Sequence, residues 1–116
     1  MITYKRGDII LVPFPFSNQT TMKKRPAVII SSDVYNMSAS DIVIMAITSQ
    51  IYKTDTIGVC VIKNWQQAGL FMQSAIKPAI STIEQIIVIK RLGKLAHEDI
   101  LSMDLALMKL LGIQVL

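Results

Sequence analysis

A run of three cations leads directly into a strand-forming segment, and this part of the sequence is the best suited to bind an anion. The cations are Lys23, Lys24 and Arg25, and Pro26 and a β-branched run at 28–30 follow them. Valine and isoleucine favour a pleated backbone, and proline, which has no N–H to donate, suits the first residue of a strand. We therefore expect Arg25 at the mouth of a strand, where a rigid scaffold holds its guanidinium ready for a phosphate.

A second group of polar side chains follows an apolar run. Residues 41–48 have the length of a strand, and their nearly continuous apolar character predicts a central strand that is covered on both faces. The run ends at Thr48, Ser49 and Gln50, whose hydroxyl and amide groups suit a phosphate or an unpaired base. The alternative is a turn whose hydroxyls cap their own backbone.

A polar segment at residues 15–22 is longer than a tight hairpin needs, which is typical of a loop that takes part in binding. Its polar groups can hydrogen-bond base edges and phosphates. Phe14 and Phe16 flank the segment, and they either stack on unpaired bases or pack into the core. The polar residues are Ser17, Asn18, Gln19 and Thr20.

The composition indicates one apolar domain. The chain has 116 residues, of which 52% are hydrophobic, a balance that predicts apolar surface buried against a partner. Its apolar segments are shorter than the ~20 residues of a membrane-spanning helix. The N-terminus has no apolar signal core, so we expect a cytoplasmic protein without a membrane association. Cys60, the single cysteine, is expected to be a small buried hydrophobe.

The net charge of +4 permits an anionic partner, and the cations gather in three clusters. These are Lys5 with Arg6, residues 23–25, and Lys90 with Arg91. Residues 6–14 read as a first strand that pairs with the strand after the cation run, so we expect the first two clusters to meet. The alternative is an ordinary solvated basic surface.

Short strands and one final helix account for the rest of the chain. Beyond the first strand, strand-like runs occur at 28–31, 41–48, 58–62, 74–77, 80–83 and 86–89. Apolar residues then recur at helical spacing over 100–111, with Glu98 and Asp99 in the first turn and Gly112 as a stop. The pattern predicts a mainly β domain of about six or seven strands, closed by an amphipathic helix that also touches a second subunit.

Several motifs, in this order and at this spacing, resemble the MazF/PemK/Kid family of toxin ribonucleases. The resemblance covers nearly the whole chain and implies a single toxin domain over residues 1–116 with the small SH3-like barrel that this family shares with CcdB. The motifs are Gly7-Asp8-Ile9, Arg25-Pro26-Ala27-Val28-Ile29-Ile30-Ser31, Ile47-Thr48-Ser49-Gln50-Ile51, Ser74-Ala75-Ile76-Lys77-Pro78, Thr82-Ile83 and Leu92-Gly93-Lys94-Leu95.

The resemblance implies a sequence-selective endoribonuclease that cuts single-stranded messenger RNA without a metal or cofactor. Attack by the 2′-hydroxyl would leave a 2′,3′-cyclic phosphate and a 5′-hydroxyl. Arg25 and Thr48 fall on the positions that carry catalysis. The family also implies a homodimer and a cognate antitoxin. The residues expected to bind RNA are Ser17, Asn18, Gln19, Thr20, Lys23, Lys24, Ser49, Gln50 and Lys77.

The residue inventory agrees with this chemistry by elimination. The only histidine is His97, so a two-histidine acid–base pair within one chain is excluded, and we expect His97 on the surface at the start of the helix. The eight carboxylates form no visible metal cluster. Segment 76–78 lacks the acidic residue and the further arginine of Kid-like members, so the general base is unassigned and Lys77 is expected to contact a phosphate.

Two other functions fit a barrel of this kind. One is a non-catalytic toxin that binds a protein such as gyrase, as CcdB toxins do. The other is a passive RNA-binding barrel whose cations only grip the backbone, and it predicts salt-sensitive binding to RNA that stays intact.

Overall fold

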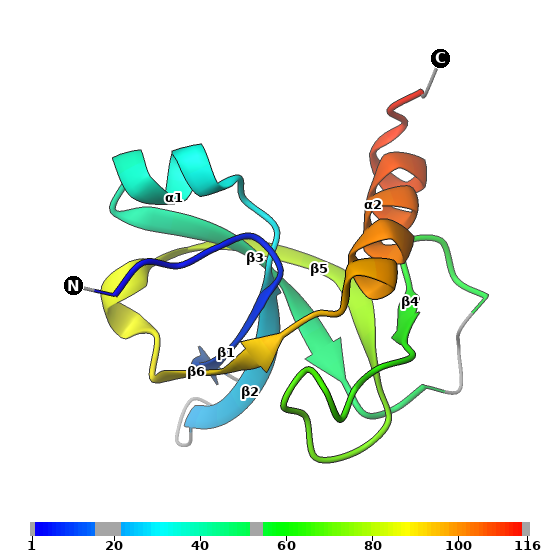
Figure 1. Ribbon diagram of the computed structural model, residues 1–116, viewed down its shortest axis with the longest axis horizontal. Helices are drawn as coiled ribbons and strands as arrows, with labels where there is room; N and C mark the ends of the chain where they lie inside the picture. The colour runs from blue at the N-terminus through cyan, green and yellow to red at the C-terminus, as the bar shows by residue number, and fades with distance from the viewer. Residues whose placement is uncertain (1, 16–21, 52–54, 115–116) are drawn as a thin grey trace.

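Six antiparallel strands form one curled sheet, with the C-terminal helix against one face and a short helix beside the third strand (Figure 1). The computed structural model describes residues 2–15, 22–51 and 55–114. The strand order is β4-β5-β3-β2-β1-β6. The mainly β fold with a C-terminal helix is therefore as predicted. The elements are β1 (Asp8–Pro15), β2 (Met22–Ile29), α1 (Asp33–Ser38), β3 (Asp41–Thr48), β4 (Cys60–Ile62), β5 (Ser74–Glu84), the short 3-10 helix η1 (Gln85–Ile87), β6 (Lys90–Lys94) and α2 (His97–Leu111).

Both faces of the central strands are buried, because side chains alternate between two cores. Ile9 and Val28 pack with Met103 and Leu107 of α2 on one face. Their neighbours, such as Ile10 and Ala27, pack on the opposite face with Tyr4 and Val88. This double burial explains the continuous apolar run of β3, whose prediction is confirmed.

Strand β2 begins at Met22, so the prediction that Arg25 stands at the mouth of a strand is wrong. Arg25 lies inside the strand opposite Val12, and Pro26 lies opposite Leu11. Pairing with β3 is confined to Ala27–Ile29. The proline is tolerated because β2 has no paired neighbour on the β3 side at that point.

Strand β5 is one long strand, where the sequence predicted two segments flanking Pro78. The register between β3 and β5 shifts between Met45 and Ile47. Pro78 falls within this irregularity, where a missing N–H costs no regular ladder bond.

The predicted strand at 86–89 is also wrong, because the chain turns there before β6 begins. The Gln85 side chain donates to the carbonyl oxygens of Asn36 (2.8 Å) and Ala39 (3.0 Å), which ties η1 to the end of α1. As a result Ile86 is 85% exposed and belongs to neither core.

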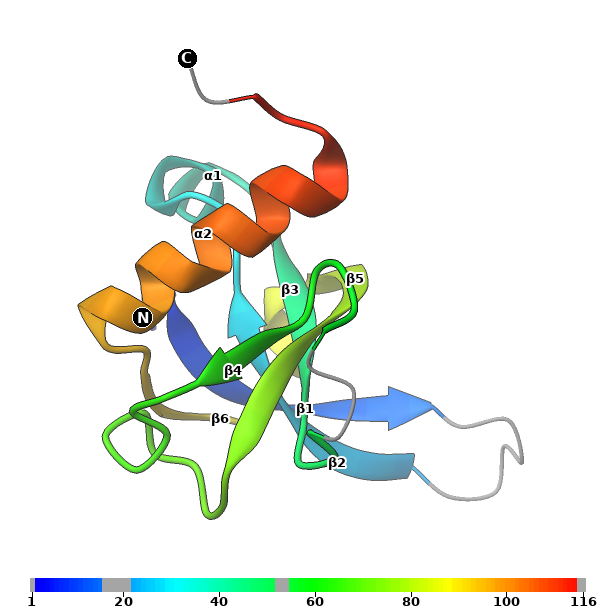
Figure 2. The same ribbon diagram turned by 90° about the vertical axis from the view of Figure 1, so that its right-hand side faces the viewer.

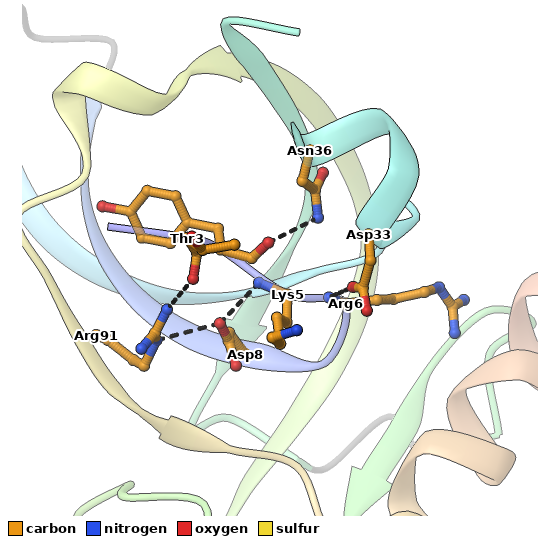
Figure 3. A network of polar contacts seen from close by, with 8 residues as sticks. Thr3, Lys5, Arg6, Asp8, Asp33, Asn36 and Arg91 are labelled. Carbon is orange, nitrogen blue, oxygen red and sulfur yellow. Dashed lines mark hydrogen bonds and ion pairs between the residues drawn. The ribbon is translucent and has the colours of Figure 1, made fainter. Parts of the chain in front are cut away.

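A polar network anchors the N-terminal segment beside β6 (Figure 3). The buried Asp8 carboxylate accepts the Lys5 N–H at 2.9 Å and pairs with Arg91 Nε at 3.1 Å. The Arg91 guanidinium also donates to the Thr3 carbonyl and lies 5.7 Å from the centre of the Tyr4 ring. Arg91 therefore has a structural role.

The expectation that the Lys5–Arg6 cluster meets the Lys23–Arg25 cluster is wrong. In an antiparallel hairpin the residues before β1 lie beside the end of β2, and the Gly7 N–H accordingly donates to Ile29 O at 2.8 Å. The Arg6 side chain donates to Ile30 O at 2.8 Å and pairs with Asp104 of α2 at 2.7 Å. Arg6 thus fastens the hairpin to the helix.

Helix α2 lies across one face of the sheet and is tied to the loop after β4 (Figure 2). Asp99, only 1% exposed, accepts the backbone N–H groups of Lys63 (3.0 Å) and Asn64 (2.9 Å). His97 is exposed at the helix start, as predicted. Among the described residues, no helix has both the length and the apolar character needed to cross a bilayer.

Cys60 is buried in the core on the α2 side, which confirms its expected role. Burial raises the pKa of its thiol, and the negative charge of Asp99 raises it further. The thiolate form is therefore disfavoured, and Cys60 is not suited to act as a nucleophile.

Two glycines bring the loop before β5 into backbone contact with β6. A Cβ atom on Gly69 would collide with the carbonyl group of Leu92, and one on Gly93 would collide with the carbonyl group of Ala68. Gly69 also has a φ of +85°, which side chains rarely adopt. The loop can lie this close only because both positions lack a side chain.

We predict that Gly93→Ala lowers the free energy of unfolding by at least about 2 kcal/mol, because the added methyl group overpacks a backbone contact. Gly112→Ala is the matched control. It meets no neighbouring atom and has a φ of +72°, so it should cost only about 1 kcal/mol of backbone strain. Urea denaturation measures both values. Equal losses in the two variants would contradict a close contact at Gly93.

Candidate functional site

Five of the residues predicted to act in the site line one hollow. The hollow has a volume of about 170 Å³ and lies where β2, β3 and β5 approach one another. Ala46 and Ile47 form the apolar part of its lining. The five predicted residues that line it are Arg25, Thr48, Ser49, Gln50 and Lys77.

The pairing register explains why Arg25 and Thr48 meet. Ala27 of β2 lies opposite Ala46 of β3. The pairing ends there, but the same register continued two residues along each strand places Arg25 on the side of Thr48, and both side chains line the hollow. Side chains two residues apart share a face of the sheet, so both point to the side of the sheet that holds the two alanines.

The third polar side chain, Lys77, lies on β5, the strand that pairs with the other edge of β3. Thr48 pairs with Ala75 of β5, and Lys77 is two residues beyond Ala75. By the same alternation, Lys77 lies on the face that carries Thr48. Three adjacent strands therefore each contribute one polar side chain to the hollow.

The Thr48 hydroxyl takes part in a turn. Its Oγ1 accepts the backbone N–H of Gln50 at 3.1 Å, which is the self-capped arrangement that the sequence left open. Accepting this bond uses a lone pair of the oxygen and leaves the hydroxyl hydrogen available for donation. Turn formation and donation to a phosphate oxygen are thus compatible, and the turn restricts where the hydroxyl can point.

The charge of the hollow is positive. Its described lining includes the Arg25 guanidinium and the Lys77 ammonium, and it includes no carboxylate or imidazole. Within residues 2–15, 22–51 and 55–114, no group of three histidine, cysteine or acidic side chains is placed to hold a metal ion. The arrangement can bind a phosphate and neutralise charge that develops on it.

The remaining predicted residues lie elsewhere. Lys24 lies outside this hollow and lines a second one next to it. Lys23 is exposed on β2 opposite Phe14 and lines neither of these two hollows. Ser17, Asn18, Gln19 and Thr20, together with Phe16 and the side chain of Phe14, are outside the described residues.

Sequence reasoning missed the second hollow, which is larger, at about 330 Å³. It shares Arg25, Ile47 and Ser49 with the first hollow. Leu11, Pro26, Leu70 and Leu92 supply much of its apolar lining, and Lys24 and Lys90 add positive charge. An available signal was the apolar run Leu70, Phe71 and Met72 directly after a glycine-closed turn, since an apolar run in a loop either packs or binds. The other lining residues include Phe71, Met72 and Ser74.

Comparison with protein families gives one match over almost the whole chain. Residues 5–111 match the family described as PemK-like, MazF-like toxin of type II toxin-antitoxin system. A search of curated proteins gives no match.

Solved structures with the same fold come from several bacteria. An endoribonuclease in complex with its cognate antitoxin, from a mycobacterial species, is 15% identical with a TM-score of 0.78 and full coverage of both chains. A MazE-MazF structure from Deinococcus radiodurans is 15% identical with a TM-score of 0.79, covering 98% of this chain and 100% of that one. Mycobacterium tuberculosis toxin MazF-mt6 is 14% identical with a TM-score of 0.73, covering 91% and 99%.

Proposed function

Because this chain belongs to the family of PemK-like, MazF-like toxins of type II toxin-antitoxin systems, we propose that it is an endoribonuclease that cuts single-stranded messenger RNA. The observation that carries the proposal is the meeting of Arg25, Thr48 and Lys77 in one positively charged hollow. The structurally similar mycobacterial protein is described as an endoribonuclease, which supports the same activity here.

The proposed reaction uses the ribose 2′-hydroxyl as the nucleophile. Its oxygen forms a bond to phosphorus while the bond from phosphorus to the 5′-oxygen breaks, giving a 2′,3′-cyclic phosphate and a 5′-hydroxyl. Arg25 neutralises the charge on the phosphorane by bidentate hydrogen bonding. Thr48 donates its hydroxyl hydrogen to a phosphate oxygen, and Lys77 holds the backbone. The 2′-hydroxyl loses its proton to a base and the departing 5′-oxygen takes up a proton from an acid, and we assign neither role to a side chain.

We further propose a homodimer and a cognate antitoxin as partners. Solved relatives include an endoribonuclease bound to its cognate antitoxin and a MazE-MazF structure. In this chain α2 exposes Leu101, Leu105 and Leu111, each more than half accessible, and such side chains suit contact with a second subunit. The proposed location is the cytoplasm, where messenger RNA is available.

We predict that Arg25→Ala lowers the rate of RNA cleavage by about 10²-fold or more, the usual effect of removing a donor that stabilises transition-state charge. The wild type should cut in excess chelator and leave 2′,3′-cyclic phosphate and 5′-hydroxyl ends, which end-group analysis measures. Lys109→Ala, which removes an exposed cation on α2, is the control and should cut like the wild type.

Three outcomes separate this function from its alternatives. Undiminished cutting by Arg25→Ala would contradict the role of Arg25. RNA that binds in a salt-sensitive way but stays intact would instead indicate a passive RNA-binding barrel. If the wild type neither binds nor cuts RNA of many sequences, a protein target becomes the better explanation.

For Thr48, we predict that the hydroxyl matters and the methyl group does not. Thr48→Val keeps the shape but removes the donor, so kcat should fall about tenfold or more, as expected for the loss of a hydrogen bond to charged phosphate. Thr48→Ser should keep most of the activity. Since Val also loses the cap to Gln50, thermal unfolding of both variants must be measured, and similar kcat values for Ser and Val would refute a donor role.

Lys77→Ala should weaken RNA binding about equally for all sequences. If Lys77 contacts one phosphate, the slope of log affinity against log salt should become less steep by roughly 0.7, the value for single strands. Lys77→Arg should restore the slope. Fluorescence anisotropy on an RNA with a 2′-deoxy residue at the cut site measures this, and an unchanged slope in Lys77→Ala would exclude the contact.

A further inference from the structure

Phe71 is the most exposed large apolar side chain among the described residues, at 89%. It lies in the loop between β4 and β5, at the lining of the second hollow. A single exposed apolar residue is ordinary on a protein surface. Phe71 differs from such a residue because contacts with the scaffold hold its loop on both sides of it.

The backbone around Phe71 is fixed by contacts with the scaffold. Gly69 lies against the Leu92 carbonyl of β6. The next residue, Leu70, is buried and donates its N–H to Trp65 O at 3.1 Å. After Phe71, the Ser74 hydroxyl donates to Met72 O at 2.8 Å. The aromatic ring is therefore presented to solvent from a backbone held at both ends.

The hollow beside Phe71 combines an apolar base with positive charge. Leu11 of β1 pairs with Pro26 on one side and with Lys90 on the other, so these three side chains share one face of the sheet. Lys24 and Arg25 supply further positive charge. A volume of about 330 Å³ falls within the range of small-ligand pockets, roughly 300–1,000 Å³.

This hollow lies next to the one that holds Thr48 and Lys77, at the place beyond Ala27 and Ala46 where β2 and β3 no longer pair. Arg25, Ile47 and Ser49 line both. A nucleotide chain whose phosphate lies on Arg25 must place a neighbouring base close to that phosphate. Unpaired bases stack on aromatic side chains, while cations bind the backbone beside them.

We propose that the second hollow holds one unpaired base of the RNA, adjacent to the phosphate bound by Arg25, and that Phe71 stacks on this base. The proposal rests on the RNA-cleaving function proposed above and adds a residue that selects the sequence to be cut. A nucleotide supplies a flat ring for the apolar lining and a negative phosphate for Arg25, which lines both hollows. An acidic peptide with an apolar side chain would match the charge but has no need of the Thr48 hollow.

The test uses Phe71→Ala, Phe71→Leu and Phe71→Tyr in the full chain. Random single-stranded RNA is cut and the new 5′-hydroxyl ends are sequenced, which gives the preference at each position around the cut. Phe71→Ala and Phe71→Leu should weaken the preference at one position next to the cut and lower kcat/KM on the preferred sequence about tenfold or more, whereas Phe71→Tyr, which keeps the ring, should retain both. Ile86→Ala, which changes an equally exposed side chain that lines neither hollow, should have no effect.

A binding assay separates failure of this inference from failure of the proposed function. The probe is an RNA with a 2′-deoxy residue at the cut site and 2-aminopurine in place of the adjacent base, whose fluorescence falls on stacking. Quenching by the wild type that is lost in Phe71→Ala supports the stacked base even if no cleavage occurs. Unchanged preference and unchanged quenching in Phe71→Ala overturn it and leave a peptide segment as the better occupant, while wild-type cleavage still supports the proposed function.

Discussion

The register in which β3 pairs with its two neighbours is the constraint on which the candidate site depends. A slip of one residue would turn every side chain of the moved strand to the other face. Arg25, Thr48 or Lys77 would then leave the hollow. The register is well determined because β3 is buried on both faces, so a slip would also exchange the residues of two different cores.

Local patterns in the sequence predicted those elements whose character does not depend on distant partners. The apolar run of β3 and the helical period of α2 were both found where expected. The start of β2 was missed because cations and a proline rarely occupy a strand, and they are allowed there only because β3 does not pair with that part. The tie between Gln85 and the end of α1, which removes the strand expected at 86–89, joins residues too distant for any local pattern to show.

The candidate site was predictable in part, and the family motifs were the reason. They marked Arg25 and Thr48, which come from different strands and have no local pattern in common. The apolar run after Gly69 gave a local sign of the second hollow, but the rest of its lining was not predictable, since it joins a loop after β4 to cations of β2 and β6. The expected meeting of Lys5 and Arg6 with residues 23–25 failed for a simple geometric reason, the direction of an antiparallel hairpin. Lys90 of β6, rather than Lys5 or Arg6, lies with Lys24 and Arg25 in the lining of the second hollow.

The two outer strands of the sheet affect how readily this apolar chain can aggregate. An uncovered strand edge offers unpaired backbone groups to other molecules and can seed aggregation. Here β4 is only three residues long, and β6 carries Lys90, Arg91 and Lys94 among its five. The short length of β4 limits pairing at its edge, and repulsion between like charges opposes pairing at the edge of β6. Neither outer strand therefore offers a long, uncharged edge with which a second copy of the chain could pair.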